Sequence, residues 1–296
     1  SLSLDASNAS SAFVRIYPND TSGGSDGTAP INRTYKTGSR VWVSAPLRSG
    51  SNYFLKWQKN GADFDRASTT SLSLDANTSL TAVYETPSCN GIAVFPGTDS
   101  IRSAMASAPA GSTFCIKSGV HRFTREVVAR ANDKFIGETG AILSGAKIVN
   151  NFAREGSYWA ATGQTQQEPA YPATNGGYPV CNASTPACIY PEKVFVNSVE
   201  LMQVTSLSAL SSGEFFFDYA NNKIYLADDP SGRTVEATVG AGGLIGYTNA
   251  GQGNVTVKNL VFEKFGGGDV SGSEHAALKA VEGWVVENNE FKQISA

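Results

Sequence analysis

The sequence predicts an almost all-β protein: a small β-sandwich module, then a truncated right-handed parallel β-helix with an N-terminal capping helix and an inserted β-hairpin subdomain. Three observations support this. Alternating apolar runs fill the first third of the chain, one short segment has a helical period, and similar strand-like runs recur between glycine turns. Charged residues make up 17% of the 296 residues, below the roughly 25% of an average protein, and this favours strands and turns over long helices.

The domain organisation expected from these patterns has four parts. They are a strand or repeat tail at 1–11, a β-module at 12–86, a linker at 87–97, and a β-helix at 98–296 with an insertion at about 153–235 that contains a hairpin. Ser1–Ala6 and Ser71–Ala76 have the same sequence, which is typical of tandem repeats, although a chance match is the alternative. Residues 1–11 are therefore the tail of a preceding copy, or a strand that completes this module or a neighbour.

The module is built from alternating runs, each of which predicts a strand with one buried face. These runs are Ala12–Tyr17, Arg40–Ser44, Tyr53–Gln58, Ser71–Leu74 and Leu80–Tyr84. Asn60-Gly61 is a strong two-residue turn signal. Together with that turn, Phe54–Trp57, Leu72–Asp75 and Leu80–Tyr84 resemble the small β-repeats of bacterial surface proteins related to internalin B-repeats. The resemblance implies a spacer or adhesive unit at a bacterial cell surface.

Three aromatic side chains of this module are candidates for carbohydrate binding. Trp42, Tyr53 and Trp57 could offer flat faces that stack on sugars. In strands of so small a module, aromatic side chains more often belong to the core. The sequence leaves both interpretations open.

A single helix is expected directly before the β-helix, because Thr98 or Asp99 can cap it and Pro109 and Gly111 end it. Its one apolar face would consist of Ile101, Ala104, Met105 and Ala108. A short helix that leads straight into strands suits a lid over the open end of a β-stack, since an exposed end would recruit other strands.

Two pairs of similar runs indicate successive coils. Thr113–Ile116 is answered by Lys134–Gly137, and Val257–Phe262 is answered by Val286–Phe291. The offset between the two runs of each pair is one short repeat, which is long enough to contain a few short strands. Repeats of this kind, roughly 20–30 residues long, indicate a solenoid.

The second pair of runs also aligns like side chains. Phe262 matches Phe291, and we expect these rings to stack inside the solenoid. Asn259 matches Asn288, and these amides could form a hydrogen-bonded ladder at a bend.

Ser100–Ala104, Ala108–Thr113, Gly119–Phe123 and Asn254–Leu260 together resemble the pectate-lyase-like right-handed parallel β-helix superfamily, over about residues 93–296. The resemblance implies the fold, whereas the superfamily hosts lyases, hydrolases, adhesins and structural proteins. Its lyases use a Lys or Arg base, usually with calcium, in middle coils that would lie beyond the end of this segment. The segment itself is therefore expected to be non-catalytic.

Candidate catalytic and metal-binding residues are few. Glu274, His275 and Lys279 lie near Asp269, and Lys279 could act as a base if its pKa were lowered, although ordinary charges on a solvated turn explain these residues equally. Asp228-Asp229 could contribute to a Ca²⁺ site, but such a cation takes roughly six to eight oxygen ligands, and no loop of suitable spacing surrounds this pair.

The four cysteines point to export. Cys181 and Cys188 flank a short loop, and a bond between Cys89 and Cys115 would join the linker to the β-helix; two buried free thiols are the alternative for that second pair. With a net charge of −3, the chain has no excess of positive charge that would attract nucleic acid. No apolar run is long enough to span a membrane.

The predicted function is a structural, adhesive or glycan-binding role in a secreted or cell-surface protein. Its expected partners are an extracellular polysaccharide or other copies of itself, because an open stack of coils or a donated strand could support assembly into a filament. The alternative is the N-terminal part of a polysaccharide lyase or another carbohydrate-active β-helix enzyme.

Overall fold

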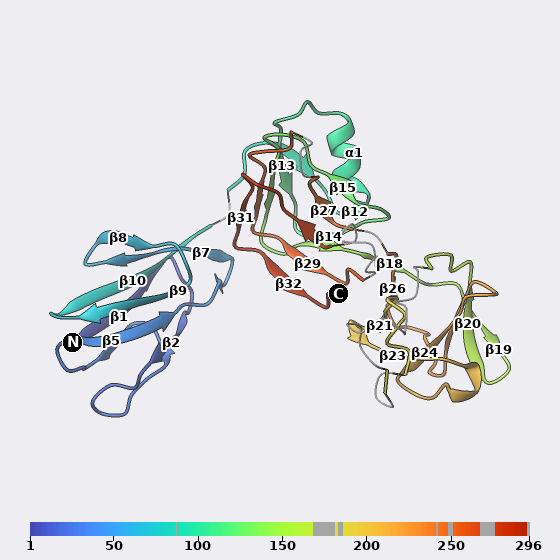
Figure 1. The fold of residues 1–296 in the computed structure, drawn as a ribbon, viewed down its shortest axis with the longest axis horizontal. Helices are drawn as coiled ribbons and strands as arrows, with labels where there is room; N and C mark the ends of the chain where they lie inside the picture. Colours follow the sequence, from blue (N-terminus) through green and yellow to red (C-terminus); the bar gives the residue numbers. More distant parts are fainter. Residues whose placement is uncertain are drawn as a thin grey trace. The chain divides into compact units, whose positions relative to one another are not determined.

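A computed structural model of the chain describes residues 1–86, 88–167, 181–182, 186–240, 242–247, 251–266 and 276–294 (Figure 1). The chain divides into two compact units, Ser1–Ser88 and Cys89–Ala296. The all-β fold class is confirmed, because the described residues form many strands, one α-helix and one 3-10 turn, η1 (Leu207–Ala209).

The first unit is a β-sandwich whose two sheets enclose one hydrophobic core. One sheet has the order β4 (Ile31–Arg33), β1 (Leu2–Ser7), β10 (Thr78–Glu85), β7 (Asn52–Lys59) and β6 (Arg48–Ser49), with β8 (Ala62–Asp65) paired to β7. The other has the order β3 (Gly27–Thr28), β2 (Phe13–Tyr17), β5 (Ser39–Ser44) and β9 (Thr69–Leu74). Burial alternates along β2 and β9, as period-two strands require. Trp57, Tyr84 and Val41 are fully buried in the shared core.

Strand β1 belongs to its own module. It pairs in parallel with β10 on one side and antiparallel with β4 on the other, and Leu2 and Leu4 are fully buried. Of the three alternatives for residues 1–11, the structure shows the strand that completes this module. Donation of this strand to a neighbouring chain stays a prediction.

The second unit stacks short parallel strands into three sheets, the arrangement of a parallel β-helix (Figure 1). The first sheet contains β11 (Ile92–Val94), β13 (Thr113–Ile116), β16 (Lys134–Gly137), β28 (Thr256–Lys258) and β31 (Val285–Glu287). The second contains β12 (Gly97–Thr98), β14 (Gly119–Arg122), β17 (Ala141–Ser144), β29 (Val261–Glu263) and β32 (Glu290–Lys292). The third contains β15 (Val127–Val128), β27 (Leu244–Ile245) and β30 (Leu278–Lys279).

Both predicted coil repeats are confirmed. Thr113 pairs with Lys134, and Val257 pairs with Val286, each across one coil. The predicted stacking of Phe262 on Phe291 is also confirmed, with ring centroids 4.9 Å apart and ring planes 10° apart. Inward-facing side chains of each coil therefore pack on their counterparts in the next.

The bends between strands explain why glycine and asparagine recur. The residue two positions before a strand of the first sheet has a positive φ in four successive coils: 83° at Gly111, 64° at Asn132, 59° at Asn254 and 83° at Gly283. Glycine and asparagine tolerate this left-handed backbone better than other residues. Asn259 and Asn288 occupy the equivalent place at the next bend, with φ of 61° and 55°.

The cross-coil hydrogen bond at that next bend comes from one residue later than predicted. Asn289 donates its side-chain N–H to the Val257 carbonyl at 2.9 Å and accepts the Leu260 N–H at 2.9 Å. The match of Asn259 with Asn288 thus reflects a shared backbone conformation, whereas Asn289 links the coils.

The expected helix is α1 (Ser100–Ala106), which buries Ile101 and Met105 against the β-helix core. Asp99 occupies the N-cap position, as predicted, but without the expected side-chain hydrogen bond. Asp99 has a left-handed backbone, and its carboxylate instead accepts the N–H and hydroxyl of Thr124, at 3.0 and 2.5 Å. Asp99 therefore ties the helix start to the loop after β14.

Both predicted disulfides are present. Cys89 is bonded to Cys115 in β13, and Cys181 to Cys188 in the insertion. The alternative of two buried free thiols is excluded by this pairing. Each bond should stabilise its region by about 2–4 kcal/mol, mainly by restricting the unfolded chain, and disulfides of this kind are typical of oxidising compartments.

The insertion interrupts one coil between β17 and β27, and it starts a few residues earlier than predicted. Its base is a sheet of β18 (Ala146–Ile148), β26 (Val235–Thr238), β21 (Val194–Val196) and β22 (Val199–Glu200). A second sheet has the order β19 (Phe152–Glu155), β20 (Tyr158–Thr162), β25 (Lys223–Leu226), β24 (Glu214–Asp218) and β23 (Met202–Val204). The predicted hairpin is β24 and β25, with Asp218 opposite Lys223.

A buried ionic cluster joins the insertion to the β-helix. Glu236 of β26 pairs with Arg122 of β14 at 2.7 Å and with Lys264, whose side chain is only 3% exposed. Lys264 also lies 3.6 Å from Glu263, which contacts Lys292 at 3.2 Å. Burial alone would raise the pKa of Glu236, but the hydrogen bonds from Lys264 and Arg122 lower it overall. These ion pairs therefore hold the insertion against the coils.

Removing one partner of this cluster should destabilise the second unit strongly. Lys264→Met leaves Glu236 with one cation instead of two, and breaking a buried pair costs about 3–5 kcal/mol of unfolding free energy. Lys117→Met is the matched control, because Lys117 and Glu138 form a pair with side chains 31% and 37% exposed, for which about 0–1 kcal/mol is expected. Urea unfolding measures the free energy of unfolding of both variants. Equal losses of stability would contradict the assignment of Lys264 to a buried ionic cluster.

The same cluster predicts acid sensitivity. Because the pKa of Glu236 is lowered in the folded state, its contribution to stability is complete above the unfolded pKa of about 4.3 and is lost as pH falls through the folded value. Glu236→Gln mimics the protonated acid, so the stability difference between the wild type and this variant should shrink as pH falls below about 4.3. A difference that stays constant from neutral pH to strong acid would contradict this.

Candidate functional site

The aromatic platform suggested by the sequence is not present. Tyr53 and Trp57 are 1% and 0% exposed, which places both in the sandwich core, whereas Trp42 is 44% exposed on the opposite sheet. The Trp57 indole N–H reaches the Ser68 carbonyl at 3.3 Å, which satisfies its polar atom inside the core. The core interpretation is therefore correct for Tyr53 and Trp57 and wrong for Trp42.

The acidic pair of the insertion closes turns. Asp228 accepts the Gly213 N–H and the Ser212 hydroxyl, both at 2.8 Å, and Asp229 accepts the Ser231 N–H at 2.8 Å. The backbone bond from Gly213 and the hydrogen bonds from Ser231 lower the pKa values of Asp228 and Asp229, respectively. Among the residues that the structure describes, no group of three or more acidic, His or Cys side chains could hold a metal.

The candidate catalytic cluster is only partly described. Lys279 lies in β30, with its Nζ 5.4 Å from the centre of the Tyr247 ring. Glu274, His275 and Asp269 lie outside the described residues, so their grouping with Lys279 stays a prediction. No helix among the described residues is long and apolar enough to cross a membrane.

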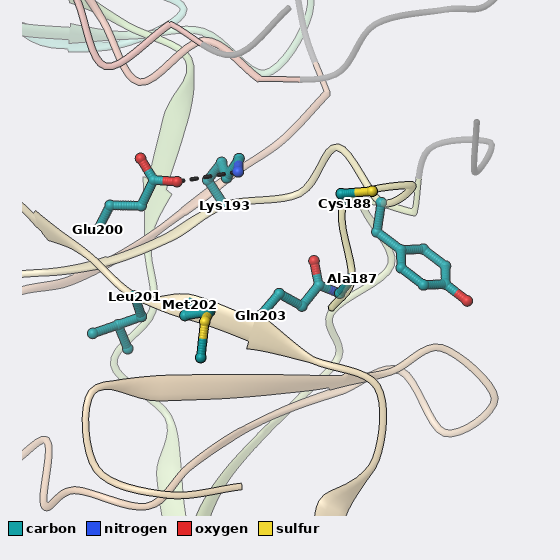
Figure 2. A pocket seen from close by; sticks show the side chains of 8 residues that line it. Ala187, Cys188, Lys193, Glu200, Leu201, Met202 and Gln203 are labelled. Carbon is teal, nitrogen blue, oxygen red and sulfur yellow. Dashed lines mark ion pairs between the residues drawn. The ribbon is translucent and has the colours of Figure 1, made fainter. Parts of the chain in front are cut away.

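A pocket of about 380 Å³ opens in the insertion beside the Cys181–Cys188 disulfide (Figure 2). Residues from the disulfide loop, the segment before β21, and β22 and β23 line it: Ala187, Cys188, Tyr190, Lys193, Glu200, Leu201, Met202 and Gln203. It combines apolar side chains, an aromatic ring, an amide and an ion pair in one concave surface. Such a mixture is typical of small-molecule sites.

An aromatic stack stands behind this pocket. The Tyr190 ring lies on Tyr219 with centroids 5.0 Å apart, and Tyr219 lies on Phe217 with centroids 4.4 Å apart and planes only 9° apart. Phe217 is buried in the insertion core. The stack therefore fixes the ring of Tyr190 to the rigid part of the insertion.

A chain of hydrogen bonds orients the amide of Gln203. Its side-chain N–H donates to the Tyr219 hydroxyl at 2.9 Å, and that hydroxyl donates to Glu192 at 2.8 Å. Burial and the charge of Glu192 raise the pKa of Tyr219, so the phenol stays protonated and remains a donor. The other polar atom of this amide, Oε1, is buried and has no hydrogen-bond partner among the described residues.

Figure 2 shows the Gln203 side chain extending from β23 toward the part of the pocket next to Ala187. At the other side, Lys193 and Glu200 form an ion pair at 3.1 Å, with side chains 33% and 44% exposed. The pair offers one charged donor and one charged acceptor with no net charge. The pocket can therefore hydrogen-bond a polar, neutral ligand.

Sequence reasoning missed this pocket. It singled out Cys181 and Cys188, whose disulfide borders the pocket, but not the polar residues between 190 and 203. Those side chains come from the segment before β21 and from β22 and β23, and they have no motif spacing, so the sequence alone carries no signal for them. The clustered tyrosines of the insertion are the one compositional hint.

Comparisons with known proteins add little to this geometry. No protein-family model matches the sequence, and a search of curated proteins finds no match. Among solved structures, one described as the complex structure of XylC with xylose has a TM-score of 0.44 and 14% sequence identity. The match covers 68% of this chain and 40% of that chain, so the chain spans less than half the length of that neighbour. Similarity at this level assigns neither a family nor an activity.

Proposed function

We propose that this chain is a glycan-binding, non-catalytic segment of an exported protein of the pectate-lyase-like β-helix type, and that the pocket of the insertion is its binding site. The unpaired Oε1 of Gln203 carries the proposal. An unsatisfied buried acceptor costs about 1–3 kcal/mol, and a ligand hydroxyl that donates to it would recover this energy once the groups that cover Oε1 move aside. The hydrogen-bonded N–H of the same amide holds Oε1 in place before the ligand arrives.

The remaining groups of the pocket suit a sugar. A sugar ring has an apolar C–H face and a rim of hydroxyls that both donate and accept hydrogen bonds. The stacked ring of Tyr190 and the side chains of Leu201 and Met202 match the apolar face, while Gln203 and the Lys193–Glu200 pair match the rim. The balanced charge of that pair favours a neutral sugar over an anion.

The non-catalytic part of the proposal rests on three of the described cations, Arg122, Lys264 and Lys279. A lyase base must be able to lose its proton and reach the substrate. Arg122 and Lys264 instead pair with Glu236 inside the protein, and Lys279 lies over an aromatic ring. The two disulfides are compatible with an exported protein.

Calorimetric titration of the full chain with soluble neutral oligosaccharides of different hexoses and pentoses should reveal at least one ligand. A dissociation constant of about 10 μM–1 mM is expected for so small a pocket, equivalent to roughly 4–7 kcal/mol of binding free energy. Gln203→Leu and Tyr190→Ala should each weaken binding about tenfold or more, because they remove the acceptor and the stacking face.

Gln58→Leu is the matched control for Gln203→Leu, because Gln58 is an amide of the first unit that donates to Asp63 at 3.1 Å. It should leave the affinity within twofold or so of the wild type. Thermal unfolding confirms that each variant is folded. If no neutral oligosaccharide binds, or if the folded Gln203→Leu variant binds normally, the pocket is not a glycan site.

The lyase alternative has a direct assay. Incubation of the full chain with pectate, alginate or glycosaminoglycans should give no rise in the absorbance of unsaturated sugar products. Turnover that is abolished in Lys279→Ala would instead assign a base to β30 and overturn the non-catalytic proposal. Lys117→Ala, on an exposed pair elsewhere in the coils, serves as the control for general loss of charge.

A further inference from the structure

The sheet formed by β3, β2, β5 and β9 in the first unit has an unusual outer surface, which we call the outer face. Phe13 and Tyr17 of β2 point outward with 54% and 69% exposure, and Trp42 of β5 with 44%. Single exposed aromatic residues need no explanation. Three on neighbouring strands of one sheet, in a unit whose core is otherwise complete, indicate an interaction surface.

Strand pairing fixes the positions of these side chains. Tyr17 lies opposite Trp42, which lies opposite Ser71 of β9, so one row across the sheet carries two aromatic rings and a hydroxyl. The ring centroids of Tyr17 and Trp42 are 6.1 Å apart and their planes are inclined by 47°. A flat crystalline surface cannot lie on two rings so inclined, whereas a single twisted polymer chain can.

Two arginines complete the outer face. Arg15 of β2 lies opposite Ser44 in the row beside Tyr17 and Trp42, and the Arg40 guanidinium lies 5.6 Å from the Trp42 ring centre and donates to Ser71 at 3.1 Å. The strands of this sheet, which the structure describes in full, carry no Asp or Glu. In a chain of net charge −3, this is a locally cationic surface.

Two acidic groups near the sheet, Asp26 and Asp20, are engaged elsewhere, whereas Asp75 directly follows β9 and forms no ion pair with Arg15 or Arg40. Asp26 lies at the edge of β2, where its carboxylate accepts the Ile16 N–H at 2.8 Å. Asp20 closes its own loop by accepting the N–H groups of Ser22 and Gly24. Neither carboxylate pairs with Arg15 or Arg40, so both guanidinium groups remain available to an anion that approaches the outer face.

We propose that the outer face binds an extended anionic polysaccharide, such as a polyuronate, through Tyr17, Trp42, Arg15 and Arg40. The aromatic rings hold successive sugar rings, since their spacing is comparable with the length of one unit in an extended chain. The arginines pair with carboxylates, for which the planar guanidinium is well suited. This surface is separate from the pocket of the insertion, and the inference does not depend on the function proposed for that pocket.

Affinity electrophoresis of the full chain through gels that contain polygalacturonate tests the proposal. The wild type should be retarded, and retardation should weaken as the salt concentration rises, because exposed charge pairs are screened. Arg15→Gln combined with Arg40→Gln should raise the dissociation constant about tenfold, as should Trp42→Ala. A gel with a neutral polysaccharide of similar length should retard the wild type much less.

Two matched controls come from the same unit. Arg66→Gln removes one exposed positive charge, and Phe64→Ala removes a ring that is 40% exposed, both away from the outer face on or next to β8. Each should change the affinity by less than about twofold. If Arg66→Gln weakens the binding of polygalacturonate as much as the arginine double variant does, the binding is general charge attraction and the proposal is overturned.

Two other results would also overturn it. Equal retardation by the neutral polymer, unchanged in the arginine double variant, would make the outer face a site for neutral glycans. Concentration-dependent dimers that Trp42→Ala disperses, without retardation by polygalacturonate, would make it an interface between copies of the chain. Gln203→Leu should leave polygalacturonate binding unchanged, so failure of the pocket and failure of the outer face are distinguished.

Discussion

Register between successive coils is the constraint on which the second unit depends. A strand that slipped by one residue would turn its inward side chains outward. Each coil must therefore begin its strands in register with those of the coil before. Glycine or asparagine in a left-handed conformation meets this requirement at the same point of four coils. At Gly137 the coils approach so closely that a Cβ atom would lie 2.4 Å from the Asn259 carbonyl oxygen. The backbone, more than any single side chain, therefore sets the stacking of Phe262 on Phe291.

A rigid stack of this kind tolerates a long insertion where the chain leaves and returns at adjacent strands. Strands β18 and β26 are such a pair, and Glu236 on the returning strand brings its charge to Arg122 and Lys264 of the coils. The insertion then has its own core and disulfide, on which a pocket can be held in a fixed shape. The repetitive coils support the insertion, and the insertion carries the polar and aromatic side chains of the pocket.

The fold was largely predictable because its signals are local and repeated. Alternation marked the strands of the sandwich, and the two matched pairs of runs gave the correct pairing register of the coils. The expected capping hydrogen bond of Asp99 is absent because Thr124, distant in sequence, competes for the same carboxylate. The site was not predictable for a related reason: Gln203, Tyr219 and Glu192 form one chain of hydrogen bonds from three separate segments. Likewise, alternation showed that Trp42 and Trp57 belong to strands but not which face of each strand meets the core.

The parallel pairing of β1 with β10 has a consequence for how the first unit forms. Leu2 pairs with Thr78, so the first strand of the sandwich cannot find its place until the last one has emerged from the translocation or synthesis machinery. Long-range contacts of this kind slow folding, because the loop must close before the pairing is gained. Until then the apolar face of β1, with Leu2 and Leu4, stays exposed. The β-helix shares this feature where the insertion interrupts it, because Lys134 of β16 pairs with Thr256 of β28; in both units an early strand therefore waits for a partner that lies far ahead in the sequence.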